Sequence, residues 1–174
     1  MTTRMVVLVP HNPAWRIAYE AEAASITAVF RPILHAIHHI GSTAVASIMA
    51  KPIIDILVEV TDIGAVDEYN QAMTTLGYIA KGENGIPGRR YFRKGSDTYH
   101  THHIHIFQVG HPEIARHLDF RDYLITHPET AQAYNDLKVR LAHQFRDSPP
   151  DYTNAKGDFI EAVIRQAAVW RMNQ

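Results

Sequence analysis

The segment that most constrains the fold of this chain is Pro52 to Val60, with the sequence PIIDILVEV. It is apolar nearly throughout and rich in β-branched residues, which predicts a strand buried on both faces of its sheet. Asp55 stands in the middle of this strand. A buried carboxylate costs several kcal/mol unless it is paired, protonated or bound to a metal. Asp55 therefore needs a partner, either an ion pair with Lys51 or an arginine, or a role in function.

Length and composition favour one ordinary domain. The chain has 174 residues, of which 46% are hydrophobic, and it contains no repeat and no linker long enough to divide it. We therefore expect a single domain over residues 1–174, large enough to be held by a hydrophobic core. The absence of cysteine excludes disulfides, thiolate zinc sites and cysteine nucleophiles. Histidine, aspartate and glutamate are then the expected metal ligands.

The charge balance gives no sign of a nucleic-acid partner. There are 17 lysines and arginines against 18 acidic residues, whereas nucleic-acid binders usually carry a basic surplus. The apolar run Met5 to Val9 is too short for the core of a signal peptide or for a membrane span. We expect a soluble, cytoplasmic protein without a membrane partner.

The distribution of apolar residues predicts an α+β fold. Helical spacing begins at Pro13, with Asn12 available as the N-cap, and proline marks the start of each late helix. The strands of the second half are joined by turn-rich segments, which indicates antiparallel pairing. We expect a mixed sheet with an N-terminal helix and C-terminal helices packed against it. The predicted helices are 13–30, 65–76, 113–125, 128–145 and 152–171, and the predicted strands are 35–40, 52–60, 78–81, 89–93 and 99–109.

The strongest functional signal is the segment from His38 to Val60, HHIGSTAVASIMAKPIIDILVEV. A strand ends at Gly41, where glycine lets the backbone approach a ligand closely. Ser42 supplies a hydroxyl, and the backbone N–H groups of Ser42 and Thr43 are suited to cradle a phosphate. Asp55 can then hold a divalent cation against that phosphate. A serine nucleophile is a weaker alternative, because no Gly-x-Ser-x-Gly elbow surrounds Ser42.

Six ordered motifs resemble the GrpB family: HIGSTAV, AKPIIDILVEV, GIPGRRYFRKG, THHIHIF, HLDFRDYL and YTNAKGDFI. The resemblance runs from about Val9 to Phe159. A Gly-Ser pair followed by an acidic strand is also the signature of the DNA polymerase β-like nucleotidyltransferase superfamily. The resemblance therefore implies the nucleotidyltransferase fold, a nucleotide substrate and a divalent metal such as Mg²⁺, Mn²⁺ or Zn²⁺.

The chain departs from the superfamily at one position. Active members carry two carboxylates on one strand, two residues apart, so that both reach the metal ions. Here Leu57 occupies the second position. Glu59 shares the face of Asp55 but lies about 13 Å further along a strand. An acid such as Glu59, Glu83 or Asp97 can still approach from elsewhere in three dimensions.

Histidines offer an alternative set of ligands. In HTHHIHIF, His103 and His105 alternate with Ile104 and Ile106, so the two imidazoles point to one face of a strand and the isoleucines into the core. In the resembled fold this strand lies beside the one that bears Asp55. Two histidines and one aspartate would form a metal site with open positions. A polar strand face without metal is the alternative.

Basic residues further along the chain are candidate phosphate ligands. Arg89 and Arg90 follow the flexible glycines of GIPGRRYFRKG, and arginine forks recognise phosphate bidentately. Lys156, in YTNAKGDFI, lies in a helical segment that can close over the sheet. A solvated hairpin and structural ion pairs are the respective alternatives.

Together these observations predict a metal-dependent nucleotidyltransferase that acts on a nucleoside triphosphate or a related phosphoester, with an unidentified acceptor. In this scheme Asp55 and Ser42 are catalytic, and Asp55, His103 and His105 hold the metal. Gly41, Ser42, Thr43, Arg89, Arg90 and Lys156 contact phosphate. Leu57 motivates an alternative, a module that binds a nucleotide, coenzyme or partner without catalysis. A third possibility is a different metal-dependent enzyme built on the histidines and Asp55.

Overall fold

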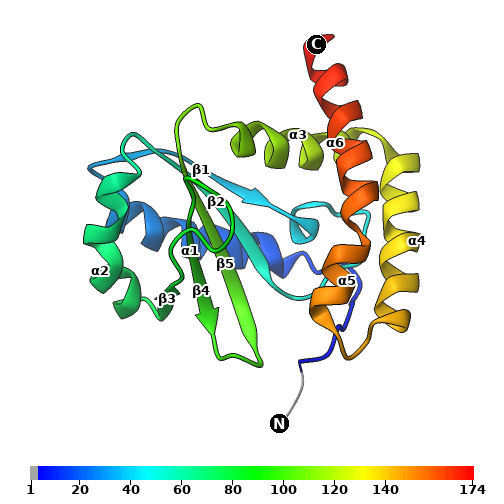
Figure 1. Ribbon diagram of the computed structural model, residues 1–174, viewed down its shortest axis with the longest axis horizontal. Helices are drawn as coiled ribbons and strands as arrows, with labels where there is room; N and C mark the ends of the chain where they lie inside the picture. Colours follow the sequence, from blue (N-terminus) through cyan, green and yellow to red (C-terminus); the bar gives the residue numbers. More distant parts are fainter. Residues whose placement is uncertain (1–3) are drawn as a thin grey trace.

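A five-stranded mixed sheet forms the centre of the computed structural model, which describes residues 4–174 (Figure 1). The strand order is β1-β2-β5-β4-β3. The central pair, β2 and β5, is parallel, and every other neighbouring pair is antiparallel. The mixed sheet and the antiparallel second half are therefore confirmed. The strands are β1 (Leu34–Ile40), β2 (Ile54–Val60), β3 (Tyr78–Ala80), β4 (Arg90–Gly95) and β5 (His100–Gln108).

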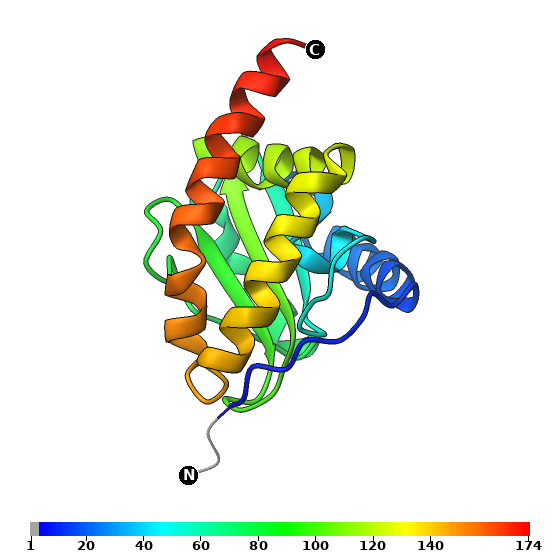
Figure 2. The ribbon, with the colours of Figure 1, turned by 90° about the vertical axis from the view of Figure 1, so that its right-hand side faces the viewer.

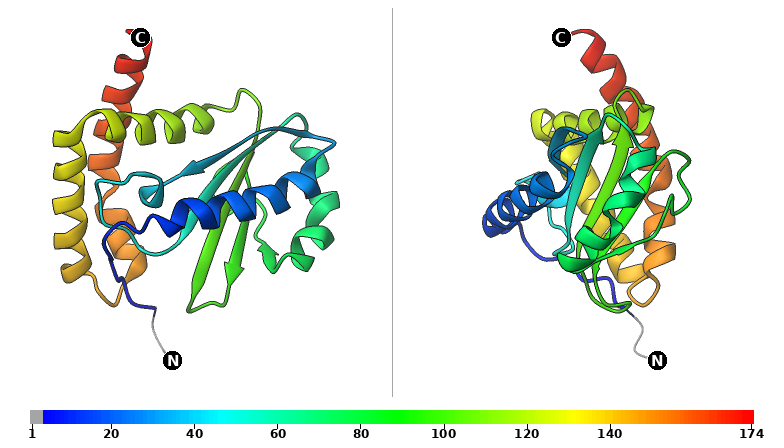
Figure 3. Two further views of the ribbon diagram at one scale, coloured as in Figure 1. Left: turned by 180° about the vertical axis from the view of Figure 1, so that it is seen from behind. Right: turned by 90° about the vertical axis from the view of Figure 1, so that its left-hand side faces the viewer.

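One face of the sheet is covered by α1 (Ala14–Phe30) and by the short helices η2 (Gly64–Tyr69) and α2 (Asn70–Thr75) (Figure 3). We call it the α1 face. Alternate residues of β2 and β5 point toward it and form the main core, with Phe30 and Met73 packed against them. Each of these strand residues is at most 4% exposed: Ile54, Ile56, Val58, Val60, Ile104 and Ile106.

The opposite face, here called the helix face, lies under the C-terminal helices (Figures 1 and 2). Leu57 and Phe107 point to this side and pack against Ile114 of the first of these helices. Asp55, His103 and His105 alternate with the residues of the α1 face and so share the helix face. The covering helices are α3 (Pro112–Thr126), α4 (Pro128–Gln144), α5 (Pro149–Ala155) and α6 (Gly157–Met172).

Most of the predicted elements form, with small shifts of their ends. The prediction of one continuous helix over 152–171 is wrong, because the chain forms α5 and α6 with Lys156 between them. Gly157 follows directly, and glycine weakens helical continuity. The segment predicted as a helix at 65–76 begins as the 3₁₀ turn of η2. No helix within residues 4–174 combines the length and apolar character required to cross a membrane.

Candidate functional site

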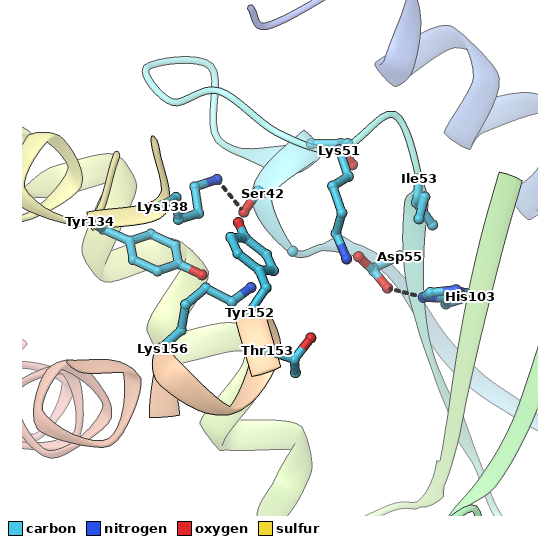
Figure 4. Close-up of a pocket in the computed structure, with 12 residues that line it drawn as sticks. Ser42, Lys51, Ile53, Asp55, His103, Tyr134, Lys138, Tyr152, Thr153 and Lys156 are labelled. Carbon is cyan, nitrogen blue, oxygen red and sulfur yellow. Dashed lines mark hydrogen bonds and ion pairs between the residues drawn. The ribbon is translucent and has the colours of Figure 1, made fainter. Parts of the chain in front are cut away.

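A pocket of about 300 Å³ lies between the helix face of the sheet and helices α4 and α5 (Figure 4). It brings together residues from four separate parts of the chain: the turn after β1, the start of β2, β5 and the C-terminal helices. Six of the predicted phosphate and metal residues meet here: Gly41, Ser42, Thr43, Asp55, His103 and Lys156. The pocket is lined by Gly41, Ser42, Thr43, Lys51, Ile53, Asp55, His103, Tyr134, Lys138, Tyr152, Thr153 and Lys156.

Lys138 is the most buried charged residue of the pocket, with 1% of its surface exposed. Its Nζ donates a hydrogen bond of 2.9 Å to Ser42 Oγ and a second one to the carbonyl oxygen of Met49. Burial, and next the charges of Lys156 and Lys51, lower the pKa of Lys138 to about 7. Within residues 4–174 it has no carboxylate partner.

Two further lysines face the same space (Figure 4). Burial, followed by the charge of Lys51, lowers the pKa of Lys156 to about 8, and burial also lowers the pKa of Lys51. The ammonium groups of Lys51 and Lys156 lie 5.6 Å and 4.3 Å from the ring centre of Tyr152. Among the lining residues Asp55 alone is acidic. The pocket therefore holds three lysines against one carboxylate.

Asp55 joins the two central strands through its carboxylate. In the parallel register of β2 and β5 it lies opposite His103, and Leu57 lies opposite His105. His103 Nδ1 and His105 Nε2 are each 3.4 Å from Asp55 Oδ1. Burial by itself raises the pKa of Asp55, but the hydrogen bonds and charges of the two histidines outweigh it and hold the pKa well below its usual value.

These three side chains have the donor types of a metal centre, but the structure does not arrange them as one. In the part of the chain that is described, no group of three histidine or acidic side chains has the geometry that would hold a metal ion. The nitrogens of His103 and His105 instead contact the Asp55 carboxylate. Asp55 on its own fits a magnesium ion, because Mg²⁺ is usually bound by one or two carboxylates together with phosphate oxygens of the substrate.

Gly41 allows the turn after β1 to approach Asp55. Its φ of 73° favours glycine, and a Cβ at this position would lie 2.7 Å from Asp55 Oδ2. The next residues form the 3₁₀ turn η1 (Ser42–Ala44). Thr43 lines the pocket but its hydroxyl is bonded to His39 Nε2 at 2.9 Å. Gly41 therefore makes room for a side chain of the protein itself, in addition to any ligand.

We call the pocket that contains Lys51, Lys138 and Lys156 the lysine-lined pocket. Arg89 and Arg90 lie outside it. Arg89 is 6% exposed and donates hydrogen bonds to the backbone carbonyls of Glu83 and Asn84, at 3.0 and 2.6 Å. Its Nη1 is also 3.3 Å from His105 Nδ1. Arg90 points to the α1 face and pairs with Asp67 of η2 at 2.8 Å. The two residues lie on opposite faces of the sheet, and both are bonded to other residues of the protein.

The acids considered as a second carboxylate have other partners. Glu59 pairs with His38 on β1 at 2.8 Å. Glu83 accepts a hydrogen bond from the backbone of Gly88, and Asp97 pairs with Arg93 while its side chain is 91% exposed. None of the three lines the pocket. Asp55 is thus the single carboxylate of the lysine-lined pocket.

Comparison with known proteins identifies the family. The family model described as GrpB protein matches residues 5–166, a range that contains all six sequence motifs. The chain belongs to the GrpB family. It is 45% identical over 168 residues to the UPF0157 protein YqkA of Bacillus subtilis, a match that covers 97% of this chain and 49% of YqkA. The chain therefore spans about half the length of that relative.

One solved structure agrees with this assignment. The crystal structure of the conserved protein GrpB from Enterococcus faecalis superimposes with a TM-score of 0.88 at 40% identity, covering 92% of this chain and 96% of that one. The fold of the GrpB family is thus the fold described above. A structure of Cid1 poly(U) polymerase aligns with a TM-score of 0.48 at 11% identity, over 85% of this chain and 49% of that chain.

Sequence reasoning missed several residues that line the pocket of this GrpB-family chain. Lys138 was detectable, because Ala131, Tyr134, Lys138 and Leu141 are the buried positions of α4, and a lysine on the apolar stripe of a helix is unusual. Lys51 was considered only as an ion-pair partner of Asp55. Tyr152 left no comparable signal, because an aromatic residue on a helix more often belongs to the core.

Proposed function

We propose that this chain is a metal-dependent nucleotidyltransferase, which binds the phosphate groups of a nucleoside triphosphate or related phosphoester in the lysine-lined pocket. One observation carries the proposal: three lysines converge on a pocket with a single carboxylate, and the most buried of them has no acidic partner among residues 4–174. Burying ammonium groups without an anion is unfavourable. A polyphosphate would supply the missing negative charge.

Ser42 and Lys138 are the expected first contacts of the phosphate. The hydrogen bond between them holds the serine hydroxyl at the pocket wall, on the turn that follows β1. A bound phosphate would favour the charged form of Lys138 and raise its pKa above the value of about 7 in the free protein. Lys51 and Lys156 approach from two other elements, so the three charges can contact different phosphoryl oxygens.

Asp55 is the residue that would hold a divalent cation in this site. Such an ion would supply charge neutralisation to the transferring nucleotidyl group. The transfer forms a bond between an acceptor oxygen and the α-phosphorus. The bond from that phosphorus to the bridging oxygen breaks, the electron pair leaves with pyrophosphate, and the acceptor proton passes to water. Lysine charges beside the leaving pyrophosphate stabilise its developing charge.

A second candidate is a binding module of the same fold without catalysis. It is favoured by Leu57, which replaces the second carboxylate, and by Asp55 being the single acid that lines the pocket. Such a module would still bind phosphate through the lysines. A metal enzyme built on His103, His105 and Asp55 is less well supported, because the described residues form no three-ligand group.

The deciding experiment measures binding and turnover together. Purified protein is titrated with inorganic tripolyphosphate and with each ribonucleoside triphosphate, with and without Mg²⁺, Mn²⁺ or Zn²⁺, and pyrophosphate release is followed. We expect Ser42→Ala to weaken tripolyphosphate binding about tenfold, the loss of one hydrogen bond to a charged group. Ser25→Ala, on the exposed side of α1, is the matched control and should bind normally.

Turnover separates the two candidates. Asp55→Asn should abolish metal-dependent pyrophosphate release while the variant stays folded and binds tripolyphosphate. Tripolyphosphate binding without turnover by wild type, with any metal or acceptor mixture, would favour the binding module. Unchanged binding by Ser42→Ala and by Lys138→Met would reject the lysine-lined pocket as a phosphate site.

A further inference from the structure

A second pocket, of about 400 Å³, opens on the other side of Asp55. It lies between the helix face of the sheet, helix α3 and helix α6, and includes Ile86 from the loop before β4. Four residues line both pockets: Gly41, Asp55, Thr153 and Lys156. The two spaces are therefore neighbours along one cleft, which meet at the carboxylate and the lysine between α5 and α6.

The lining of this second pocket differs in character from that of the first. Its walls are largely apolar, and its one arginine is paired with two glutamates. Arg116 lies 3.0 Å from Glu113 on the same helix and also pairs with Glu161 of α6. His117 Nδ1 is 3.8 Å from the same Glu113. The apolar part consists of Ile40, Ile86, Phe120, Ile160 and Ile164.

The difference in charge between the two pockets favours one orientation of a ligand along the cleft. A polyphosphate is attracted to the three lysines and finds no unpaired basic group beyond Lys156, because Arg116 is already held by two glutamates. An uncharged ring system gains from apolar walls, which contribute about 25 cal/mol for each Å² of apolar surface buried. Ligand pockets typically measure about 300–1,000 Å³, a range that includes each of these two spaces.

We infer that the second pocket holds the nucleoside part of the phosphoester, with its phosphates in the lysine-lined pocket and its phosphate-bearing carbon beside Asp55. This inference rests on the proposed function and adds the place where the base and sugar bind. Apolar residues of α3 and α6 enclose the base. The guanidinium of Arg116, the glutamates that hold it and the ring of His117 offer donors and acceptors to its polar edge.

A two-probe titration tests the inference. Inorganic tripolyphosphate reports on the lysine-lined pocket alone, whereas ATP, GTP, CTP and UTP report on both pockets. We expect at least one of the four nucleotides to bind ten times more tightly than tripolyphosphate. Ile164→Trp fills the second pocket and should weaken that nucleotide at least tenfold, with tripolyphosphate affinity unchanged within twofold. Val169→Trp, an exposed position on the same helix, is the matched control and should change neither.

A second variant keeps the inference testable if Ile164→Trp does not fold. Arg116→Gln removes a partly exposed charge on α3 and should weaken the nucleotide at least threefold without changing tripolyphosphate. Equal affinities for nucleotide and tripolyphosphate in wild type, or full nucleotide affinity in both variants, would overturn the inference. Nucleotide binding that depends on Ile164 while tripolyphosphate does not bind would support this pocket and reject the lysine-lined one. Absence of all binding would reject both.

Discussion

The two faces of the sheet use the same strands for different purposes. On β2 and β5, the residues that point to the α1 face include Ile54, Ile56, Ile104 and Ile106, all nearly inaccessible to solvent. Their immediate neighbours in the sequence point to the helix face and include Asp55 and the two histidines. Because side chains alternate along a strand, a single segment builds a dry core on one side and a polar site on the other.

The two faces differ in what their side chains contribute to the free energy of folding. Apolar burial on the α1 face contributes favourable free energy for each side chain removed from water. The pocket beside the helix face instead contains lysines whose charged forms are disfavoured by burial, which lowers their pKa values. Apolar burial on the α1 face thus offsets the cost of burying these lysines.

The largest expected effect comes from the α1 face. Ile104→Ala should lower the free energy of unfolding by about 2–5 kcal/mol, because Ile104 is fully buried and its truncation leaves a cavity. Chemical denaturation measures this change. Ile79→Ala on the edge strand β3, where the side chain is 44% exposed, should cost less than about 1 kcal/mol. Folded Ile104→Ala should keep wild-type affinity for tripolyphosphate, and a large loss would show that the two faces are not separable.

A smaller effect on stability, which depends on pH, is expected from Lys138 of α4, beside the helix face. Its pKa is about 7 in the folded protein and 10.5 in an unfolded chain. Between these two pKa values the lysine is protonated in the unfolded state but largely deprotonated in the folded state, so the stability of wild type rises with pH. Below pH 7 the lysine is protonated in both states, and its contribution to stability does not change with pH. Relative to Lys138→Met, wild type should gain on the order of 3 kcal/mol from pH 7 to 10.

Denaturation of both proteins at each pH checks this expectation. Each lysine with a lowered pKa other than Lys138 is present in both proteins, so its contribution largely cancels in the difference. Parallel stability curves for wild type and Lys138→Met would mean that Lys138 stays charged in the folded protein. The pocket beside the helix face would then carry more positive charge above pH 7 than the lowered pKa of Lys138 implies.

Much of the fold was predictable because its signals are local. The apolar run of β2 and the alternation of His103 and His105 with isoleucines report directly on strand faces. The proximity of Gly41 to Asp55 also followed from the sequence, although the reason for the glycine did not: the absent Cβ would contact Asp55 itself. Such contacts depend on the register between β1 and β2, which the order of residues along the chain does not specify.

The partners of the basic residues were harder to predict. Arg89 and Arg90 share a glycine-rich motif, yet one holds a loop on the helix face and the other pairs with Asp67 across the α1 face. Lys138 enters the pocket from helix α4 and lies 96 residues beyond the serine that it contacts. Long-range hydrogen bonds of this kind are set by the packing of helices on the sheet, and no local pattern encodes them.

The smallest expected effect tests the contact between the turn after β1 and the site. Gly41→Ala and Gly110→Ala both place a side chain at positive φ, 73° and 87°. Gly41 also has a ψ of −174°, a backbone region that essentially glycine alone adopts. An added Cβ meets Asp55 Oδ2 at Gly41 but meets nothing within 4 Å at Gly110. Gly41→Ala should therefore be at least about 1 kcal/mol less stable than Gly110→Ala in thermal or chemical unfolding.

The same pair of variants should differ more clearly in function than in stability. Displacement of Asp55 by the new methyl group would move the carboxylate away from the lysine-lined pocket, so Gly41→Ala should lose metal-dependent nucleotide binding while Gly110→Ala retains it. Titration with Mg²⁺ and a nucleoside triphosphate measures this directly. Equal binding by both variants would show that nucleotide binding tolerates the displacement of Asp55. The turn after β1 would then contribute to the site through Ser42 alone.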